Sequence, residues 1–206
     1  KEKTAPTITI TAPSAGAYTT NTTPTIEFQV KDADSGVNAG TIAVTVDGTA
    51  VSTVTKTAID GGYKCTCTSP TLKDGSHTIS VKASDNDGNA AAAKTATFTV
   101  DTVPPTLQIT APSNDLVTNK KTVTITGKTD DVTSKPVTVT VNGATVTVGT
   151  DGTFTKDVTL VESANTITIV AKDKAGKTTT VTRKVTVDTS APVIRSITLT
   201  PNPVDC

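Results

Sequence analysis

One short segment occurs twice in this chain, at a spacing that restricts the fold. Residues 100–106 (VDTVPPT) return as residues 187–193 (VDTSAPV), and the opening residues 5–13 (APTITITAP) belong to the same series. Copies that lie roughly ninety to a hundred residues apart indicate tandem domains of immunoglobulin size, because solenoid repeats recur at much shorter intervals. We therefore expect a first domain over residues 1–101, a second over 102–188, and the truncated first strand of a third over 189–206.

Composition and alternation predict that these domains are all-β. Threonine and valine are the most frequent residues, and β-branched side chains favour pleated sheet over helix. No stretch sustains an apolar period of 3.6 residues. Short strands with alternating apolar positions, such as Ile26, Phe28 and Val30, are separated by turns at intervals that are typical of an immunoglobulin-like Greek-key β-sandwich.

The pattern predicts seven strands in each domain. In the first domain they are expected at Thr7–Thr11, Thr25–Lys31, Thr41–Val46, Ala50–Thr55, Tyr63–Thr68, His77–Ala83 and Lys94–Val100. In the second they are expected near Thr106–Thr110, Thr122–Thr126, Val137–Val141, Ala144–Val148, Phe154–Leu160, Asn165–Ala171 and Thr178–Val187. The dipeptides Asp47-Gly48 and Asn142-Gly143 occupy matching places in the two domains and favour tight hairpin turns, which need positive φ angles.

Charge and hydropathy exclude several classes of function. The formal net charge is zero, which argues against nucleic acid or an anionic membrane as a partner. No apolar run approaches the length that crosses a bilayer, so we expect no membrane insertion in this segment. The chain contains no methionine and opens without an apolar signal region, and we therefore expect it to be part of a longer protein.

Three segments carry a family resemblance. Residues 75–89 (GSHTISVKASDNDGN), residues 98–105 (FTVDTVPP) and the loop 32–37 (DADSGV) resemble bacterial Ig-like (Big-type) domains. Such domains stand in tandem on cell-surface proteins, secreted polysaccharide-active enzymes and phage structural proteins. The resemblance implies tandem β-sandwiches that serve as spacer, adhesin or accessory module. The second domain lacks a clear Ser-Gly loop at residues 130–133.

Calcium is the candidate ligand for the acidic loops. Asp32, Asp34, Asp85, Asp87 and Asp101 place carboxylate oxygens near the expected domain ends and the junction, and Ca²⁺ is bound by six to eight oxygen ligands. The alternative interpretation is that these side chains cap turn amides, as Asp commonly does. The loops also lack the spacing and the closing glutamate of an EF-hand.

Other candidate chemistry is sparse. Tyr18 and Tyr63 are the aromatic residues expected to be exposed, and they are the candidates for stacking against a sugar. His77 is the sole histidine and belongs to no recognisable catalytic triad, so we expect no enzyme activity. Cys65 and Cys67 lie two residues apart on one strand, where they should share a face as packed free thiols.

These observations favour a non-catalytic spacer or stalk in a larger bacterial surface or secreted protein. Its expected location is extracellular, and its expected neighbours are the flanking domains of the same chain. One alternative is an adhesin or accessory module that binds a cell-wall or host polysaccharide or a surface protein. A second alternative is an Ig-like decoration of a phage particle.

Overall fold

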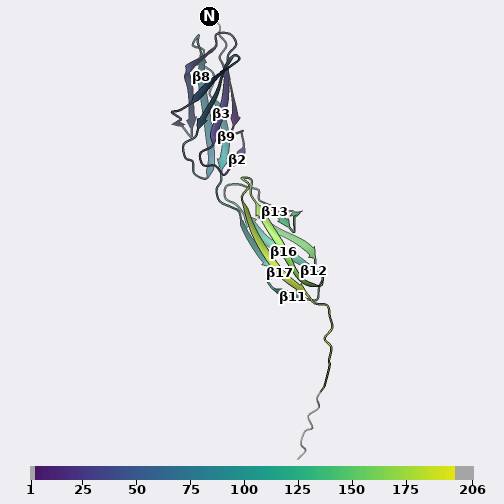
Figure 1. Ribbon diagram of the computed structural model, residues 1–206. Helices are drawn as coiled ribbons and strands as arrows, with labels where there is room; N and C mark the ends of the chain where they lie inside the picture. The colour runs from purple at the N-terminus through teal and green to yellow at the C-terminus, as the bar shows by residue number, and fades with distance from the viewer. Residues whose placement is uncertain (1–2, 198–206) are drawn as a thin grey trace, which may run out of the picture.

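The computed structural model describes residues 3–197 and contains two β-sandwiches that follow one another along a long axis (Figure 1). The first has nine strands in its described residues: β1 (Thr7–Ala12), β2 (Ala17–Thr19), β3 (Thr25–Lys31), β4 (Val37–Val46), β5 (Thr49–Ala50), β6 (Thr55–Ile59), β7 (Gly62–Thr68), β8 (Gly75–Asp85) and β9 (Lys94–Val100). They form two sheets, of order β1-β3-β7-β6 and β2-β9-β8-β4-β5.

The second sandwich repeats this plan with one strand fewer in its described residues. Its strands are β10 (Thr106–Ala111), β11 (Leu116–Thr118), β12 (Thr122–Asp130), β13 (Thr138–Val141), β14 (Ala144–Val146), β15 (Thr153–Thr159), β16 (Ser163–Lys172) and β17 (Thr178–Val187). Its sheets have the orders β10-β12-β15 and β11-β17-β16-β13-β14. The all-β prediction is therefore confirmed, and no helix in the described residues is long and apolar enough to cross a membrane.

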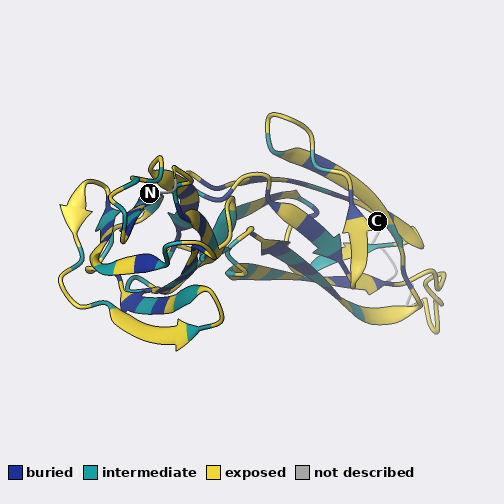
Figure 2. Cartoon of the chain, turned by 90° about the horizontal axis from the view of Figure 1, so that it is seen from above, coloured by how far each residue is buried: buried dark blue, intermediate teal, exposed yellow. Residues whose placement is uncertain are grey.

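Each sandwich has its own core, built by the predicted alternation. In β3, Ile26, Phe28 and Val30 are all fully buried, and in β16 Ile167 and Ile169 occupy the same kind of position. The buried residues form two separate hydrophobic clusters, one in each sandwich. Seen from above, bands of buried and of more exposed residues alternate along the strands of both sandwiches (Figure 2). Because strand side chains alternate between faces, one apolar face is enough to specify this packing.

Two short strands were not predicted. After β1 pairs with β3, the chain crosses to the other sheet, where β2 runs parallel to the last strand β9. In the second domain β11 runs parallel to β17 in the same way. No residue of these three-residue strands is fully buried, and their pairing depends on a tertiary neighbour far along the sequence.

The strand predicted at Ala50–Thr55 was wrong. Residues 51–54 form no strand, and the chain passes there from β5 in one sheet to β6 in the other. Four of the five residues of β6 are exposed, so no buried face marks it in the sequence. The start of a third domain, predicted over 189–206, shows no strand in residues 189–197, and its remainder, including Cys206, lies outside the described residues.

Candidate metal centre at the domain junction

Contacts from both sandwiches hold the segment between β9 and β10. Asp74 of the first domain accepts hydrogen bonds from the backbone N–H and the hydroxyl of Thr102, both at 2.9 Å. From the second domain, the hydroxyl of Thr179 donates to the carbonyl of Pro105. The ammonium of Lys174 lies 5.3 Å from the ring centroid of Tyr18, a cation–π contact that joins the two domains directly.

Three aspartates meet at this junction. Asp101 follows β9 of the first domain, whereas Asp131 follows β12 and Asp173 follows β16 of the second. One carboxylate oxygen from each lies within 4.8 Å of the others. The three residues are only 0%, 6% and 5% exposed, respectively. Two unit charges about 5 Å apart repel by about 3 kcal/mol at an effective dielectric constant near 20, so this arrangement calls for a compensating positive charge.

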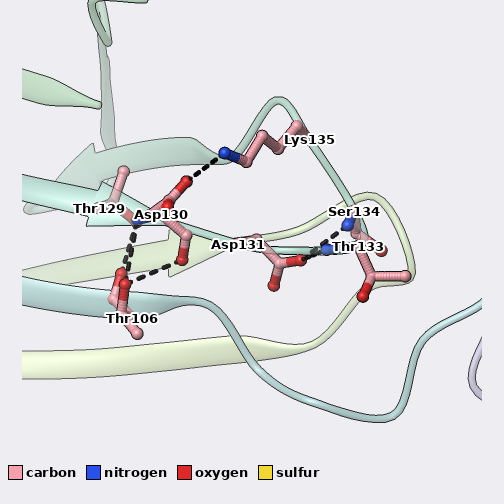
Figure 3. Close-up of polar contacts among 7 residues, drawn as sticks. All are labelled: Thr106, Thr129, Asp130, Asp131, Thr133, Ser134 and Lys135. Carbon is pink, nitrogen blue, oxygen red and sulfur yellow. Dashed lines mark hydrogen bonds and ion pairs between the residues drawn. The ribbon is translucent and has the colours of Figure 1, made fainter. Parts of the chain in front are cut away.

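Backbone amides fix each carboxylate through one oxygen. Oδ1 of Asp131 accepts the N–H groups of Thr133 at 2.8 Å and Ser134 at 2.7 Å (Figure 3). Oδ1 of Asp173 accepts the N–H of Lys177 at 2.8 Å, and Oδ1 of Asp101 accepts the N–H of Val103 at 3.1 Å. Each of these bonds spans two to four residues, so the loops themselves orient the three carboxylates.

The remaining oxygens are the unusual feature of the site. Oδ2 of Asp101, Oδ2 of Asp173 and Oγ of Ser134 are buried and have no hydrogen-bond partner. A buried polar atom without a partner costs about 1–3 kcal/mol, and more when it is charged. Lys135, which follows Ser134 in the sequence, does not supply one, because it pairs with the exposed carboxylate of Asp130 at 2.7 Å (Figure 3). Within residues 3–197 no ion pair involves any of the three buried carboxylates.

The structure therefore brings together one of the predicted calcium ligands, Asp101, with two residues that sequence reasoning missed. Asp131 corresponds to Asp32 when the two domains are aligned on residues 6–13 and 105–112, and Asp173 corresponds to Asp85 when the turns 83–89 and 171–177 are aligned. This internal correspondence was the available signal. It is weak for Asp131, because residues 130–133 lack the Ser-Gly pair of the first domain.

The other predicted ligands lie at the far end of the first domain. Asp32 is buried there and accepts the N–H groups of Asp34 at 3.2 Å and Gly36 at 2.9 Å through Oδ1. Asp85 is buried as well and accepts the N–H of Asn89 at 2.7 Å. Asp34 is exposed and Asp87 is half-buried. These contacts are the turn-capping role that was the alternative interpretation, and a calcium role for these four residues stays a prediction.

Both tyrosines predicted to stack against a sugar are half-buried, and that binding role stays a prediction. Tyr18 is half-buried in β2, not in a turn, and it lies under Lys174 of the second domain. Tyr63 is half-buried in β7 and packs against the first core. Cys65 and Cys67 are free, buried side by side on the inner face of β7, and burial raises the pKa of both thiols. Their predicted packing role is confirmed.

The side chain of His77 in β8 contacts two loops of the first domain, through Lys73 and Asp47. Its Nε2 donates to the carbonyl of Lys73 at 2.8 Å, and its Nδ1 lies 2.6 Å from Oδ2 of Asp47. Burial lowers the pKa of His77, but the hydrogen bonds to both acceptors and the charge of Asp47 outweigh it and hold the pKa above 6.5. Burial acts oppositely on Asp47, and its bonds to His77 and to the N–H of Thr78 bring the pKa of Asp47 below 3.8.

We expect the first domain to lose stability as the pH rises from 6 to 9. A histidine whose pKa is raised by folding stabilises the fold below its unfolded pKa, and that contribution disappears as the pH rises through the folded pKa. The effect should be modest because the Asp47 side chain is 45% exposed. Denaturant unfolding followed by tyrosine fluorescence measures it, since both tyrosines lie in the first domain. His77→Asn should remove the slope, and equal slopes in the two proteins would refute the assignment.

Comparison with known proteins agrees with this fold. A family described as bacterial Ig-like domain matches residues 4–102, and glucodextranase domain B matches residues 105–189. Bacillopeptidase F of Bacillus subtilis (strain 168) is 29% identical over 188 residues, which are 91% of this chain but only 12% of that protein. The chain thus spans about an eighth of the length of this relative.

Solved structures show the same architecture. The fibronectin(III)-like modules of Clostridium thermocellum CbhA match with a TM-score of 0.54 at 22% identity, over 88% of this chain and 94% of theirs. An I-band fragment of titin matches with a TM-score of 0.50 at 13% identity, over 89% of this chain and 66% of the fragment. At these identities the similarity concerns the fold alone.

Fold and junction together define a tandem of immunoglobulin-like β-sandwiches. Within this class, the first unit belongs to the family of bacterial Ig-like domains, and the second unit is similar to domain B of glucodextranase. From the sequence we expected Big-type domains in both places, and the match of the second unit to glucodextranase domain B refines that expectation.

Proposed function

We propose that this chain is a non-catalytic spacer in a larger extracellular bacterial protein and that it holds its two domains in a fixed relative orientation. The junction carries the proposal. A flexible tether needs no contacts across it, whereas here Tyr18, Asp74 and Asp101 of the first domain meet the linker or the loops of the second. Interdomain motion is the default for linked domains, so such contacts support a mechanical role.

The relatives support the extracellular placement and the absence of catalysis. The match to the peptidase of Bacillus subtilis covers a small share of that protein, so its named activity is not assigned to this segment. In residues 3–197, the sole histidine is engaged by Asp47 and Lys73 on the first domain, and no nucleophile is hydrogen-bonded to it. Placement on a phage particle stays an alternative prediction.

We expect the two domains of the purified chain to tumble together in solution as one elongated body. Nitrogen-15 relaxation measures rotational diffusion for each domain separately, and both should report the same anisotropic tensor. Asp74→Ala should loosen the junction because it removes both bonds to Thr102. Glu162→Ala is the matched control, since Glu162 accepts the same two bonds from Thr189 at the opposite end of the second domain, both at 2.8 Å.

Two results would contradict the proposal. Independent tumbling of the two domains in the unmodified chain would exclude a stiff spacer. Saturable binding of the chain to bacterial cell walls, to insoluble polysaccharide or to a host surface protein would favour the adhesin or accessory alternative. A spacer should show no such binding.

A further inference from the structure

We propose that Asp101, Asp131 and Asp173 bind one calcium ion that bridges the two domains. The proposal rests on the spacer function in one respect: it names what holds the junction stiff. The ion's ligands come from both sides, because Asp101 ends the first domain while the other two belong to loops of the second. A bound ion would therefore cross-link the place where the chain leaves one sandwich to the place where it enters the next.

The donor chemistry selects a hard cation. The cluster offers carboxylate oxygens only, and the neighbouring buried hydroxyl of Ser134 adds a neutral oxygen. Zinc sites in proteins are dominated by histidine and cysteine ligands. His77, Cys65 and Cys67 do not belong to this cluster, because His77 is bonded to Asp47 and Lys73 and the cysteines lie in the first core. Ca²⁺ and Mg²⁺ are the cations that carboxylates and hydroxyls suit.

The spacing fits calcium, and the irregular geometry of the site favours calcium over magnesium. Ligand oxygens on opposite sides of an ion are separated by twice the metal–oxygen distance, which is about 4.6–5.2 Å for Ca²⁺ and about 4.0–4.2 Å for Mg²⁺. The three carboxylate oxygens lie within 4.8 Å of one another, which is compatible with Ca²⁺ without rearrangement of the loops. Calcium also accepts an irregular shell completed by water, whereas magnesium requires near-ideal octahedral geometry.

The unpartnered oxygens are what distinguish this cluster from ordinary surface acidity. Oδ1 of each aspartate is already used by a backbone amide, which leaves Oδ2 of Asp101 and Oδ2 of Asp173 buried with no donor. Loop capping alone would not require these second oxygens to be buried. Because no ion pair in residues 3–197 compensates their charge, a bound cation explains both the burial and the missing partners.

Calorimetric titration of the intact 206-residue chain with CaCl₂ tests the proposal, after removal of metal by chelator. We expect one Ca²⁺ per chain, with Mg²⁺ at least about tenfold weaker. Asp101→Asn, Asp131→Asn and Asp173→Asn should each weaken binding about tenfold or more, because affinity depends on the charge of the ligands. Asparagine keeps the oxygen that accepts the loop amide, and circular dichroism without calcium verifies that each variant folds.

Asp188→Asn is the matched control. Asp188 repeats the local geometry of Asp101 at the end of the second domain: its N–H donates to Thr118 at 2.9 Å and its Oδ1 accepts the N–H of Ser190 at 2.9 Å. It does not belong to the cluster, so its substitution should leave the affinity unchanged. No binding at 10 mM CaCl₂, or equal loss in Asp188→Asn and Asp173→Asn, would overturn the proposal.

The stiff spacer and the calcium site can be refuted independently of each other. If calcium binds as predicted but the relaxation data show independent domains, then the site exists and the stiff spacer is wrong. If the domains tumble together in chelator and no calcium binds, the spacer function stands and the calcium site is refuted.

Discussion

Truncation of Phe28 to alanine should destabilise the first domain by about 3–5 kcal/mol and leave the second nearly unaffected. Phe28 is fully buried at the centre of the first core, and the loss combines the transfer of a large aromatic ring with the cavity that remains. The two cores share no residue, so the damage should stay in one sandwich. Tyrosine fluorescence reports the first domain, and calorimetry resolves both.

Phe154→Ala is the reciprocal control. Phe154 is buried in the second core, and its truncation should lower the second calorimetric transition while the tyrosine signal keeps its midpoint. If both substitutions shifted both transitions equally, the sandwiches would form one cooperative unit, and their description as two independently folded domains would be wrong.

Gly152→Ala should be the most damaging small substitution in the second domain. A Cβ at this position would lie 2.1 Å from the carbonyl oxygen of Thr129, and the residue has a φ of +83°. Left-handed backbone costs a non-glycine residue about 1–2 kcal/mol, and the overlap adds about 1–3 kcal/mol, so we expect a loss of about 2–5 kcal/mol in all.

Gly143→Ala separates these two causes. Gly143 has nearly the same φ, +80°, but a Cβ there would meet nothing within 4 Å. Its substitution should therefore cost only the backbone strain, about 1–2 kcal/mol. Urea unfolding of the two variants measures the difference. Equal losses would show that the loop around Thr129 moves away from an added methyl group.

The sequence was sufficient to predict the class of fold because one face of most strands is buried. Ile79 and Val81 are fully buried and alternate with less buried residues along β8, so a period of two is visible without knowledge of the partner strand. The same rule explains the failures. β6 is almost wholly exposed, and β2 is too short for a period, so neither leaves an alternating pattern.

The site was harder to predict because its residues come from three separate segments. Asp101 was recognised from its position in the repeated linker, whereas Asp131 and Asp173 look like ordinary turn aspartates in isolation. Their common feature is burial against the end of the neighbouring domain, which no local motif encodes. The two tyrosines show the same limitation, since the partner of Tyr18 is a lysine more than 150 residues later.

The parallel pairs β2–β9 and β11–β17 bear on how each domain would respond to tension. In each pair one strand lies near the point where the chain enters the sandwich and the other ends where it leaves. A pull on the two ends therefore slides these strands along each other, and it loads their hydrogen bonds together instead of opening them one after another. Forced opening of a domain is governed by its unfolding rate and not by its free energy of folding. For a stalk under shear, the relevant property of this fold is thus its lifetime under load.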